Sequence, residues 1–305
     1  MRVIVTGASG FIGQPLCAKL LEHGHEVVAL CRTFRPPESS HLQLFKHIPY
    51  VMGDKLPQEA ISFTPEVVVN LAWDGIPDFS ERKCLDNVEA QLRFLKQTEK
   101  FTQLNKIVSS GTCREYGAKE GACMEMERVQ PDSYFSWAKQ TLADYFRLAC
   151  QQRQIDLVWL RIFYVYGPGQ RTASLIPSLV KAFQARLIPD IKNPSTANDY
   201  IYIDDVVSAF VKSVENLDCC GTFNLGSGST TTVAEIAEIV EKIILKESHF
   251  SRKLCEYKER HGFPLGIWAD TNSTRDQLGW IPETNLSQGI EYTCKTLLKQ
   301  RLCQL

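Results

Sequence analysis

Residues 3–13 read Val3-Ile4-Val5-Thr6-Gly7-Ala8-Ser9-Gly10-Phe11-Ile12-Gly13: an apolar run, a glycine-rich turn and the start of an amphipathic stretch. Gly7 permits a tight turn, Gly10 lets the backbone approach a pyrophosphate, and Gly13 lets a helix pack close to a sheet. The first amides of that helix and its dipole favour phosphate. We therefore predict a strand, a phosphate-binding turn and a helix, with Ser9, Phe11 and Ile12 also lining the ligand.

Short apolar runs alternate with longer amphipathic stretches over the first two-thirds of the chain. The pattern predicts strands at 2–6, 26–30, 67–71, 106–110 and 157–163, and helices at 11–23, 84–102 and 134–152. After residue 169 the pattern is less regular, with strands expected at 199–203 and 222–225. Further helices are expected at 204–216, 232–246 and 287–302.

This alternation indicates an α/β fold, a Rossmann-type doubly wound parallel sheet with a smaller C-terminal substrate-binding lobe. We expect a dinucleotide-binding domain over 1–166, joined by a later strand from the region 199–225. Residues 167–305 are expected to form mainly the substrate-binding lobe.

Composition restricts the class of protein. The 305 residues are 44% hydrophobic and 23% charged, with a formal net charge of -1, which argues against nucleic-acid and membrane partners. The apolar runs are too short to span a bilayer, and the first strand begins without a leader pattern. The eleven cysteines include no Cys-x-x-Cys pair, so we expect reduced thiols, no metal site and a cytoplasmic location.

The spacing of the three glycines resembles that of the short-chain dehydrogenase/reductases. Gly10-Phe11-Ile12-Gly13 resembles their extended branch, which acts on nucleotide-linked sugars. The resemblance covers nearly the whole chain: Gly53-Asp54 matches a pair that contacts adenine, and Asn70-Leu71-Ala72 matches a strand end beneath the cofactor. It implies that Asp54, Leu71 and Ala72 bind the cofactor, and that a homodimer forms through the 84–102 and 134–152 helices.

The end of the second strand bears on the choice of cofactor. NAD-binding proteins usually place a carboxylate there, about 20 residues after the glycine turn, to receive the ribose 2′-hydroxyl. Here the expected position holds Cys31, followed by Arg32. Because arginine pairs with a 2′-phosphate, we favour NADP(H), with NAD(H) possible. In the alternative interpretation Arg32 is only a solvated surface residue.

Members of the family carry a Ser or Thr, a Tyr, and a Lys four residues after the Tyr. The resemblance places Thr112 and Lys139 at two of these catalytic positions, with Lys139 also on the cofactor, but Phe135 stands at the tyrosine position. Without a phenol, proton transfer loses a contribution of about 10²–10⁴-fold in rate.

Three explanations of Phe135 stay open. The chain is an engineered Tyr→Phe variant, or a natural member that lacks the acid, or Tyr134 serves after a local shift. Tyr134 lies about 100° further round a helix, so it is not expected to share the face of Lys139.

The residues after Thr112 bear on the reaction. Dehydratases of this family carry Asp-Glu there, whereas this chain has Cys113-Arg114; a ketoreductase or an epimerase is left. The NADP-favouring strand end points to NADPH-dependent reduction of a nucleotide-linked 4-keto-6-deoxy sugar at C4. An epimerase is the first alternative, and a non-catalytic dinucleotide-binding protein is the second.

Five residues are expected at the nucleotide-sugar substrate, and the first is Thr112, whose hydroxyl orients the sugar oxygen. Arg114 follows the catalytic threonine, and Tyr164, also expected at the cofactor, stands where many members have Asn. Trp73 follows a strand end, where an aromatic ring can stack on a sugar or simply pack. Asn198 stands where the family often has an Arg for the diphosphate, and Arg171 is expected to compensate unless it is only a surface residue.

Overall fold

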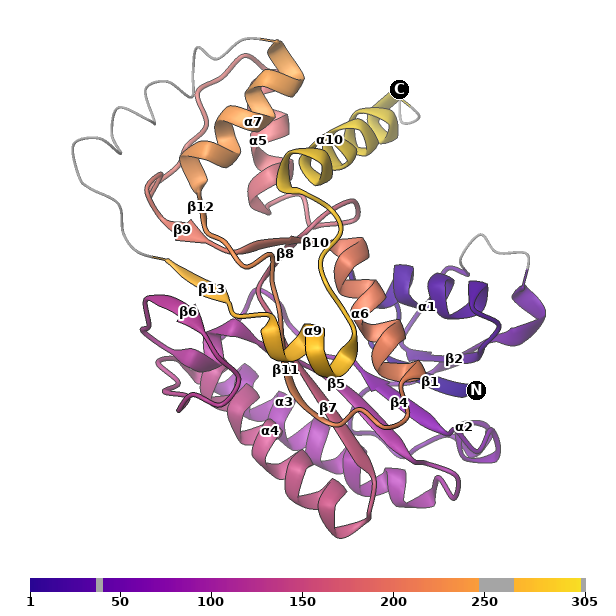
Figure 1. Ribbon diagram of the computed structural model, residues 1–305. Helices are drawn as coiled ribbons and strands as arrows, with labels where there is room; N and C mark the ends of the chain where they lie inside the picture. The colour runs from indigo at the N-terminus through magenta and orange to yellow at the C-terminus, as the bar shows by residue number, and fades with distance from the viewer. Residues whose placement is uncertain (37–40, 247–265, 303–305) are drawn as a thin grey trace.

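The computed structural model describes residues 1–36, 41–246 and 266–302 (Figure 1). Its central element is a seven-stranded sheet in the order β11-β7-β5-β4-β1-β2-β3, and every neighbouring pair is parallel. The strands are β1 (Arg2–Thr6), β2 (Glu26–Cys31), β3 (Phe45–Pro49), β4 (Val67–Asn70), β5 (Lys106–Thr112), β7 (Asp156–Ile162) and β11 (Gly221–Leu225).

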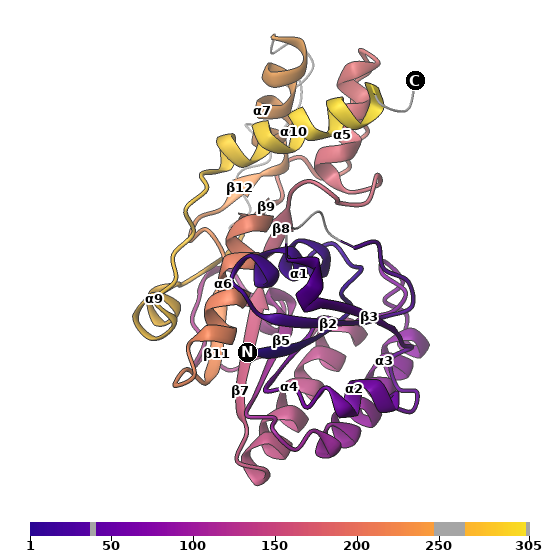
Figure 2. The same cartoon turned by 90° about the vertical axis from the view of Figure 1, so that its right-hand side faces the viewer.

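Helices cover both faces of this sheet because consecutive strand residues point to opposite sides. Val3 and Val5 of β1 join the apolar core formed with α1 (Gly13–Glu22) and α6 (Ile203–Glu215). Ile4, between them, joins a second core. The second core includes residues of α3 (Glu81–Gln97) and α4 (Tyr134–Gln152), and Figure 2 shows these helices on the opposite side of the strands from α1. The predicted doubly wound α/β fold is therefore confirmed.

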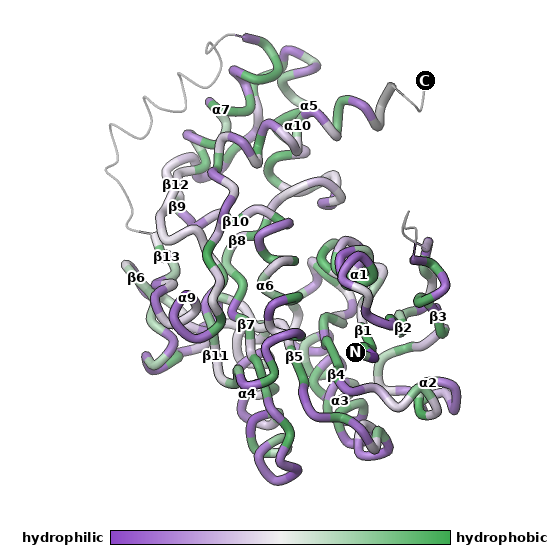
Figure 3. The backbone as a smooth tube through the Cα atoms, turned by 45° about the vertical axis from the view of Figure 1, so that its right-hand side comes forward, coloured by the Kyte–Doolittle hydropathy of each residue, from purple (hydrophilic) through white to green (hydrophobic). Residues whose placement is uncertain are grey.

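Burial on both faces explains the nearly continuous apolar sequence of the central strands. Val67, Val68 and Val69 of β4 are completely buried, and Figure 3 shows apolar residues along the strands of the large sheet. Within the described ranges, no helix has the length and hydropathy that a bilayer crossing requires.

Two smaller sheets lie at the carboxyl ends of the large sheet's strands. β8 (Tyr164–Tyr166) pairs in parallel with β10 (Tyr200–Tyr202). The second small sheet has the order β12-β9-β13-β6, with β6 (Gly121–Cys123), β9 (Ala197–Asn198), β12 (Thr231–Thr232) and β13 (Ile267–Ala269). Beyond them lie α5 (Leu175–Gln184), α7 (Val233–Leu245) and α10 (Leu286–Leu302), at the top of Figure 1. The short helices α2 (Gln58–Ser62) and α9 (Asn272–Leu278) complete the α-helices of the described part.

The predicted elements differ from the observed ones mainly at their ends. The helix expected at 84–102 begins at Glu81, because the Ser80 side chain accepts a hydrogen bond from the Lys83 amide and caps it. The strand expected at 199–203 is β10, which pairs with β8, whereas the one expected at 222–225 is β11, which joins the large sheet. The sequence prediction missed β3, α2, α5, α9 and the short strands β6, β8, β9, β12 and β13.

Candidate active site

The glycine-rich turn has the geometry that its sequence predicts. Gly7 has a φ of +65°, and a Cβ there would lie 2.8 Å from the Ala72 backbone. A Cβ on Gly13 would lie 2.4 Å from the Gly7 carbonyl oxygen. Only glycine therefore lets the first turn of α1 approach both β1 and the segment that follows β4.

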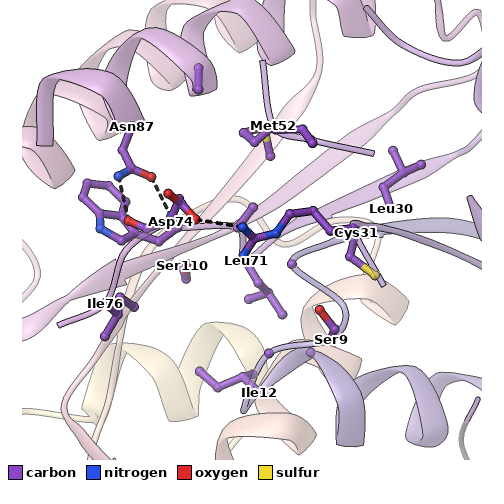
Figure 4. Close-up of a pocket in the computed structure, with 18 of the residues that line it drawn as sticks. Ser9, Ile12, Leu30, Cys31, Met52, Leu71, Asp74, Ile76, Asn87 and Ser110 are labelled. Atoms are coloured by element: carbon purple, nitrogen blue, oxygen red, sulfur yellow. Dashed lines mark hydrogen bonds and ion pairs between the residues drawn. The ribbon is translucent and has the colours of Figure 1, made fainter. Parts of the chain in front are cut away.

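A cleft of about 800 Å³ opens at this turn, within the range of ligand sites. Its walls come from residues 7–13, the end of β2, residues 50–52, the segment after β4 and the first turns of α3. Figure 4 shows this cleft with Ser9 and Ile12 on one side and Met52 and Asn87 on the other. The cleft lies at the carboxyl ends of β1 and β4, where a doubly wound sheet changes direction.

The structure divides the predicted residues into two groups. Those that line the cleft are Gly7, Ser9, Gly10, Phe11, Ile12, Gly13, Arg32, Leu71, Ala72 and Trp73. Those outside its described lining are Asp54, Thr112, Arg114, Phe135, Lys139, Tyr164 and Arg171. Val51 and Met52 line the wall near which Asp54 was expected, and Val165 lines the cleft next to Tyr164.

Lys139 lies directly behind the cleft wall. Its side chain is 6% exposed, and Nζ donates a hydrogen bond of 2.9 Å to the carbonyl oxygen of Ser110, a residue that lines the cleft. Nζ also lies 4.7 Å from the centre of the Trp73 ring, within cation–π range. Burial lowers the pKa of Lys139 to about 8, and the Glu115 carboxylate opposes this shift.

Phe135 contacts the same indole as Lys139. Its ring meets the Trp73 ring edge-on, with centroids 5.2 Å apart, and lies 4.5 Å from the centroid of Phe79. The spacing of four residues on α4 thus places Phe135 and Lys139 on one face. Tyr134 lies elsewhere: it is 51% exposed and hydrogen-bonds to Glu81. The geometry therefore argues against the explanation in which Tyr134 serves as the acid.

Trp73 has an unusual environment. Its Nε1 is buried and has no hydrogen-bond partner among the described residues. An indole N–H in that position requires an acceptor. Because Trp73 lines the cleft, a bound ligand is a candidate to supply that acceptor.

Thr112 ends β5 and caps the 3-10 turn Cys113–Tyr116. Its hydroxyl accepts a hydrogen bond of 3.3 Å from the Arg114 amide, and its own amide donates to Glu115 Oε1 at 2.9 Å. Glu115 is completely buried and pairs with Arg161 Nε at 2.8 Å. The hydroxyl of Thr112 keeps its proton available for donation, and this buried ion pair fixes the strand end that carries it.

Arg114 and Tyr164 lie together. The Arg114 guanidinium hydrogen-bonds to the Tyr164 side chain and lies 3.9 Å from the Asp132 carboxylate. Burial raises the pKa of Tyr164 above its usual value, and the hydrogen bond from Arg114 opposes the shift. Arg171, in contrast, lies on the exposed segment before α5.

Two side chains of α3 that the sequence analysis missed hold the segment after β4. Gln91 Nε2 donates to the Ala72 carbonyl oxygen at 2.5 Å, and Asn87 bonds to both the amide and the carbonyl of Asp74, at 2.8 and 3.0 Å. These two amides flank Trp73 and fix its backbone. In the sequence, two amide side chains spaced four residues apart on an otherwise apolar helix face indicate that both are buried and hydrogen-bonded.

Arg32 meets a carboxylate in the cleft. Its Nη1 lies 3.5 Å from Asp74 Oδ1, and Lys83 Nζ lies 2.9 Å from Asp74 Oδ2. The hydrogen bond from Lys83 is the largest influence lowering the pKa of Asp74. Within the described ranges, no cluster of side chains is suited to hold a metal ion.

Comparisons with known proteins agree with this arrangement. Residues 3–226 match the model of the NAD dependent epimerase/dehydratase family. The chain is 26% identical to an uncharacterized UDP-glucose epimerase of Bacillus subtilis, covering 95% of this chain and 96% of that protein. It is also 26% identical to the dTDP-4-dehydro-6-deoxyglucose reductase of Escherichia coli, covering 97% of each.

A solved structure extends the agreement to three dimensions. The UDP-glucuronic acid 4-epimerase of Bacillus cereus, in complex with NAD, superposes with a TM-score of 0.82. That likeness covers 98% of this chain and 99% of the epimerase, at 25% sequence identity. With the parallel sheet, the glycine turn and the cleft above it, the match over residues 3–226 shows that the chain belongs to the NAD dependent epimerase/dehydratase family, whose members include enzymes that act on nucleotide sugars.

Proposed function

We propose that this protein is an NADPH-dependent reductase that acts at C4 of a nucleotide-linked 4-keto-6-deoxy sugar, with turnover limited by Phe135. The observation that carries the proposal is the position of Lys139, a buried ammonium that is hydrogen-bonded to Ser110 behind the cleft wall and lies over the Trp73 ring, which Phe135 also contacts. The E. coli relative named above as a reductase supports the same reaction class.

The cleft fits a dinucleotide. Its size, the close approach of Gly7 and Gly13, and the unpartnered indole N–H of Trp73 all suit a bound cofactor. The first amides of α1 would hold the pyrophosphate, and Leu71 and Ala72 would lie beneath the dinucleotide. NADP(H) is favoured through Arg32. The nicotinamide ring, when bound, supplies hydride to the keto carbon.

The chain's own residues orient the sugar and stabilise the charge that develops on its keto oxygen. Thr112 donates a hydrogen bond to the keto oxygen and holds it toward the nicotinamide. Lys139, protonated below its pKa of about 8, stabilises negative charge that develops on that oxygen. Phe135 donates no proton, so the proton that converts the alkoxide to the alcohol comes from solvent water, and reduction proceeds slowly. Arg114 and its hydrogen-bond partner Tyr164 would contact the sugar nucleotide, together with the exposed Arg171.

The decisive experiment measures NADPH consumption with a panel of nucleotide-linked 4-keto sugars, for this chain and for Phe135→Tyr. Rapid turnover by the tyrosine variant, with one sugar preferred, supports the reductase and identifies its substrate. If neither protein consumes NADPH although both bind the ligands, the reductase proposal is rejected, and epimerisation or a purely binding role is favoured instead.

An epimerase is the second candidate, favoured by the pairing of Arg32 with Asp74, which engages the arginine on which the NADP preference depends. The NAD-bound epimerase of B. cereus supports this candidate. An epimerase keeps its cofactor through the cycle, so purified protein would retain a dinucleotide and give a product isomeric with its substrate.

We also propose a homodimer through α3 and α4, which lie side by side on the outer face of the sheet (Figure 1). Large apolar side chains are exposed there, namely Leu85, Trp137, Tyr145 and Leu148. A surface of this kind is typical of a protein interface. Light scattering after size exclusion should give twice the chain mass, and Leu148→Glu should give a monomer.

The same arrangement supports a division of labour between two parts of the chain. We propose that residues 1–166 with β11 bind the dinucleotide and that most of 167–305 binds the sugar nucleotide. The layer of α5, α7 and α10 beyond the strand ends supports this division (Figure 2).

A further inference from the structure

Asp74 lies between two cations at the edge of the cleft. Oδ1 faces Arg32 Nη1 at 3.5 Å, and Oδ2 accepts a hydrogen bond from Lys83 Nζ at 2.9 Å. All three residues line the cleft, and Figure 4 shows Asp74 in this cleft beside Asn87. The carboxylate thus occupies a position in which an anion is stabilised from two sides.

The two sides of this contact differ in rigidity. Asn87 fixes the Asp74 backbone through two hydrogen bonds, and Lys83 lies on the same helix as Asn87, so the carboxylate is anchored to α3. The Arg32 side chain is 73% exposed and stands at the start of the segment after β2. Arg32 is therefore the partner that is free to turn.

We propose that Asp74 is an internal counter-ion that competes with the cofactor's 2′-phosphate for Arg32 and so sets the preference between NADP(H) and NAD(H). This inference rests on the proposed cofactor class and assigns the residue that tunes it. With NAD(H) bound, Arg32 stays on Asp74. With NADP(H) bound, Arg32 turns to the phosphate, with which it forms a two-point contact.

Lys83 makes this exchange of partners feasible. When Arg32 leaves, Asp74 keeps its hydrogen bond to Lys83 and is not left as an unpaired carboxylate. The remaining cost is the lost contact with Arg32 together with repulsion between the carboxylate and the phosphate. Both effects lower the affinity for NADP(H) and leave that for NAD(H) nearly unchanged.

The test measures the dissociation constants of NADPH and NADH at fixed ionic strength, from energy transfer between tryptophan and nicotinamide. Asp74→Asn keeps the shape of the side chain and removes its charge. It should raise the preference for NADPH over NADH about two- to fivefold, as expected for an exposed charge pair. Lys83→Met removes the second cation from Asp74, so the carboxylate pairs more strongly with Arg32. This variant should shift the preference toward NADH.

Two further variants separate this effect from general charge. Asp86→Asn removes the same charge from the same cleft, and it should change the preference less than twofold. In an Arg32→Gln background, Asp74→Asn should have a smaller effect, because only the repulsion between the carboxylate and the phosphate remains to be removed. A thermal melt of each variant confirms that it is folded.

Equal changes in both affinities after Asp74→Asn, or weaker NADPH binding, would overturn the inference, as would binding of neither dinucleotide. The binding assay needs no sugar nucleotide. If Asp74→Asn shifts the cofactor preference but no sugar is reduced, the reductase proposal is rejected and the counter-ion role of Asp74 is supported. If sugar is reduced but the preference does not shift, the reductase proposal is supported and the counter-ion role is rejected.

Discussion

Phe135 packs edge-on against Trp73, with ring centroids 5.2 Å apart and an interplanar angle of 89°. The Lys139 ammonium lies over the same indole at 4.7 Å. A residue four positions before a buried lysine is thus fixed in place without any hydroxyl to pass a proton. The catalytic role proposed for Lys139 and the slow turnover proposed for Phe135 both depend on this relationship.

Phe135→Tyr should increase turnover about 10²–10⁴-fold, since it adds a single oxygen to a ring already held by Trp73 and Phe79. Steady-state rates of NADPH consumption measure the gain. Tyr134→Phe is the matched control, because it removes a hydroxyl from the neighbouring, exposed residue and should leave turnover unchanged in both backgrounds. A lower turnover in Tyr134→Phe would instead support the explanation in which Tyr134 serves as the acid.

Lys139 should give stability a distinct dependence on pH. Burial lowers its pKa from 10.5 to about 8, so between these values the unfolded chain binds more protons than the folded one. The free energy of unfolding therefore rises with pH across this window, by an amount on the order of 3 kcal/mol. Below about pH 8 both states bind the proton, and the cost of burying the ammonium is present in full.

Chemical denaturation of the native chain and of Lys139→Met from pH 7 to 10.5 measures this contribution. Other groups titrate equally in the two proteins, so the difference between their curves isolates Lys139. The native chain should gain stability relative to the variant as the pH rises. Parallel curves would show that the ammonium is not buried in solution.

Alanine substitutions at two glycines of the turn should affect stability and cofactor binding differently. Gly13→Ala places a Cβ 2.4 Å from the Gly7 carbonyl oxygen and should destabilise the protein by about 1–3 kcal/mol. Gly10→Ala meets that oxygen at 3.1 Å and should affect stability less. Because Gly10 is proposed to face the pyrophosphate, Gly10→Ala should bind NADPH much more weakly while its melting temperature stays nearly unchanged. An unchanged affinity for NADPH would show that Gly10 is not part of the binding site.

The buried pair of Glu115 and Arg161 should be costly to break. Glu115 accepts hydrogen bonds from Arg161 Nε at 2.8 Å and from Trp159 Nε1 at 3.2 Å. Arg161→Met leaves a buried carboxylate without its cation and should cost about 3–5 kcal/mol in urea unfolding. Arg161→Met combined with Glu115→Gln should recover much of this loss, because the double variant buries no charge. Full loss in the double variant would mean that packing, not charge, explains the effect.

Local patterns predicted the parts of the fold that depend on neighbouring residues. Apolar runs near 67–71 and 106–110 correspond to β4 and β5, and the spacing of Phe135 and Lys139 corresponds to one face of α4. Most strands of two or three residues escaped prediction, since strands such as β9 and β12 are too short to show any periodicity. Their pairing depends on partners distant in the chain.

The sequence by itself determined the glycine turn, the alternation of strands and helices and the absence of a tyrosine at 135. These properties depend on residue type and on spacing within one turn or one helix, which a linear pattern contains. The tertiary structure alone decided that Asp74 meets Arg32, and that the Ser110 carbonyl receives the Lys139 ammonium. Those contacts join residues that are far apart in the sequence. They meet only after the strands have paired in the parallel sheet and the helices have packed against it.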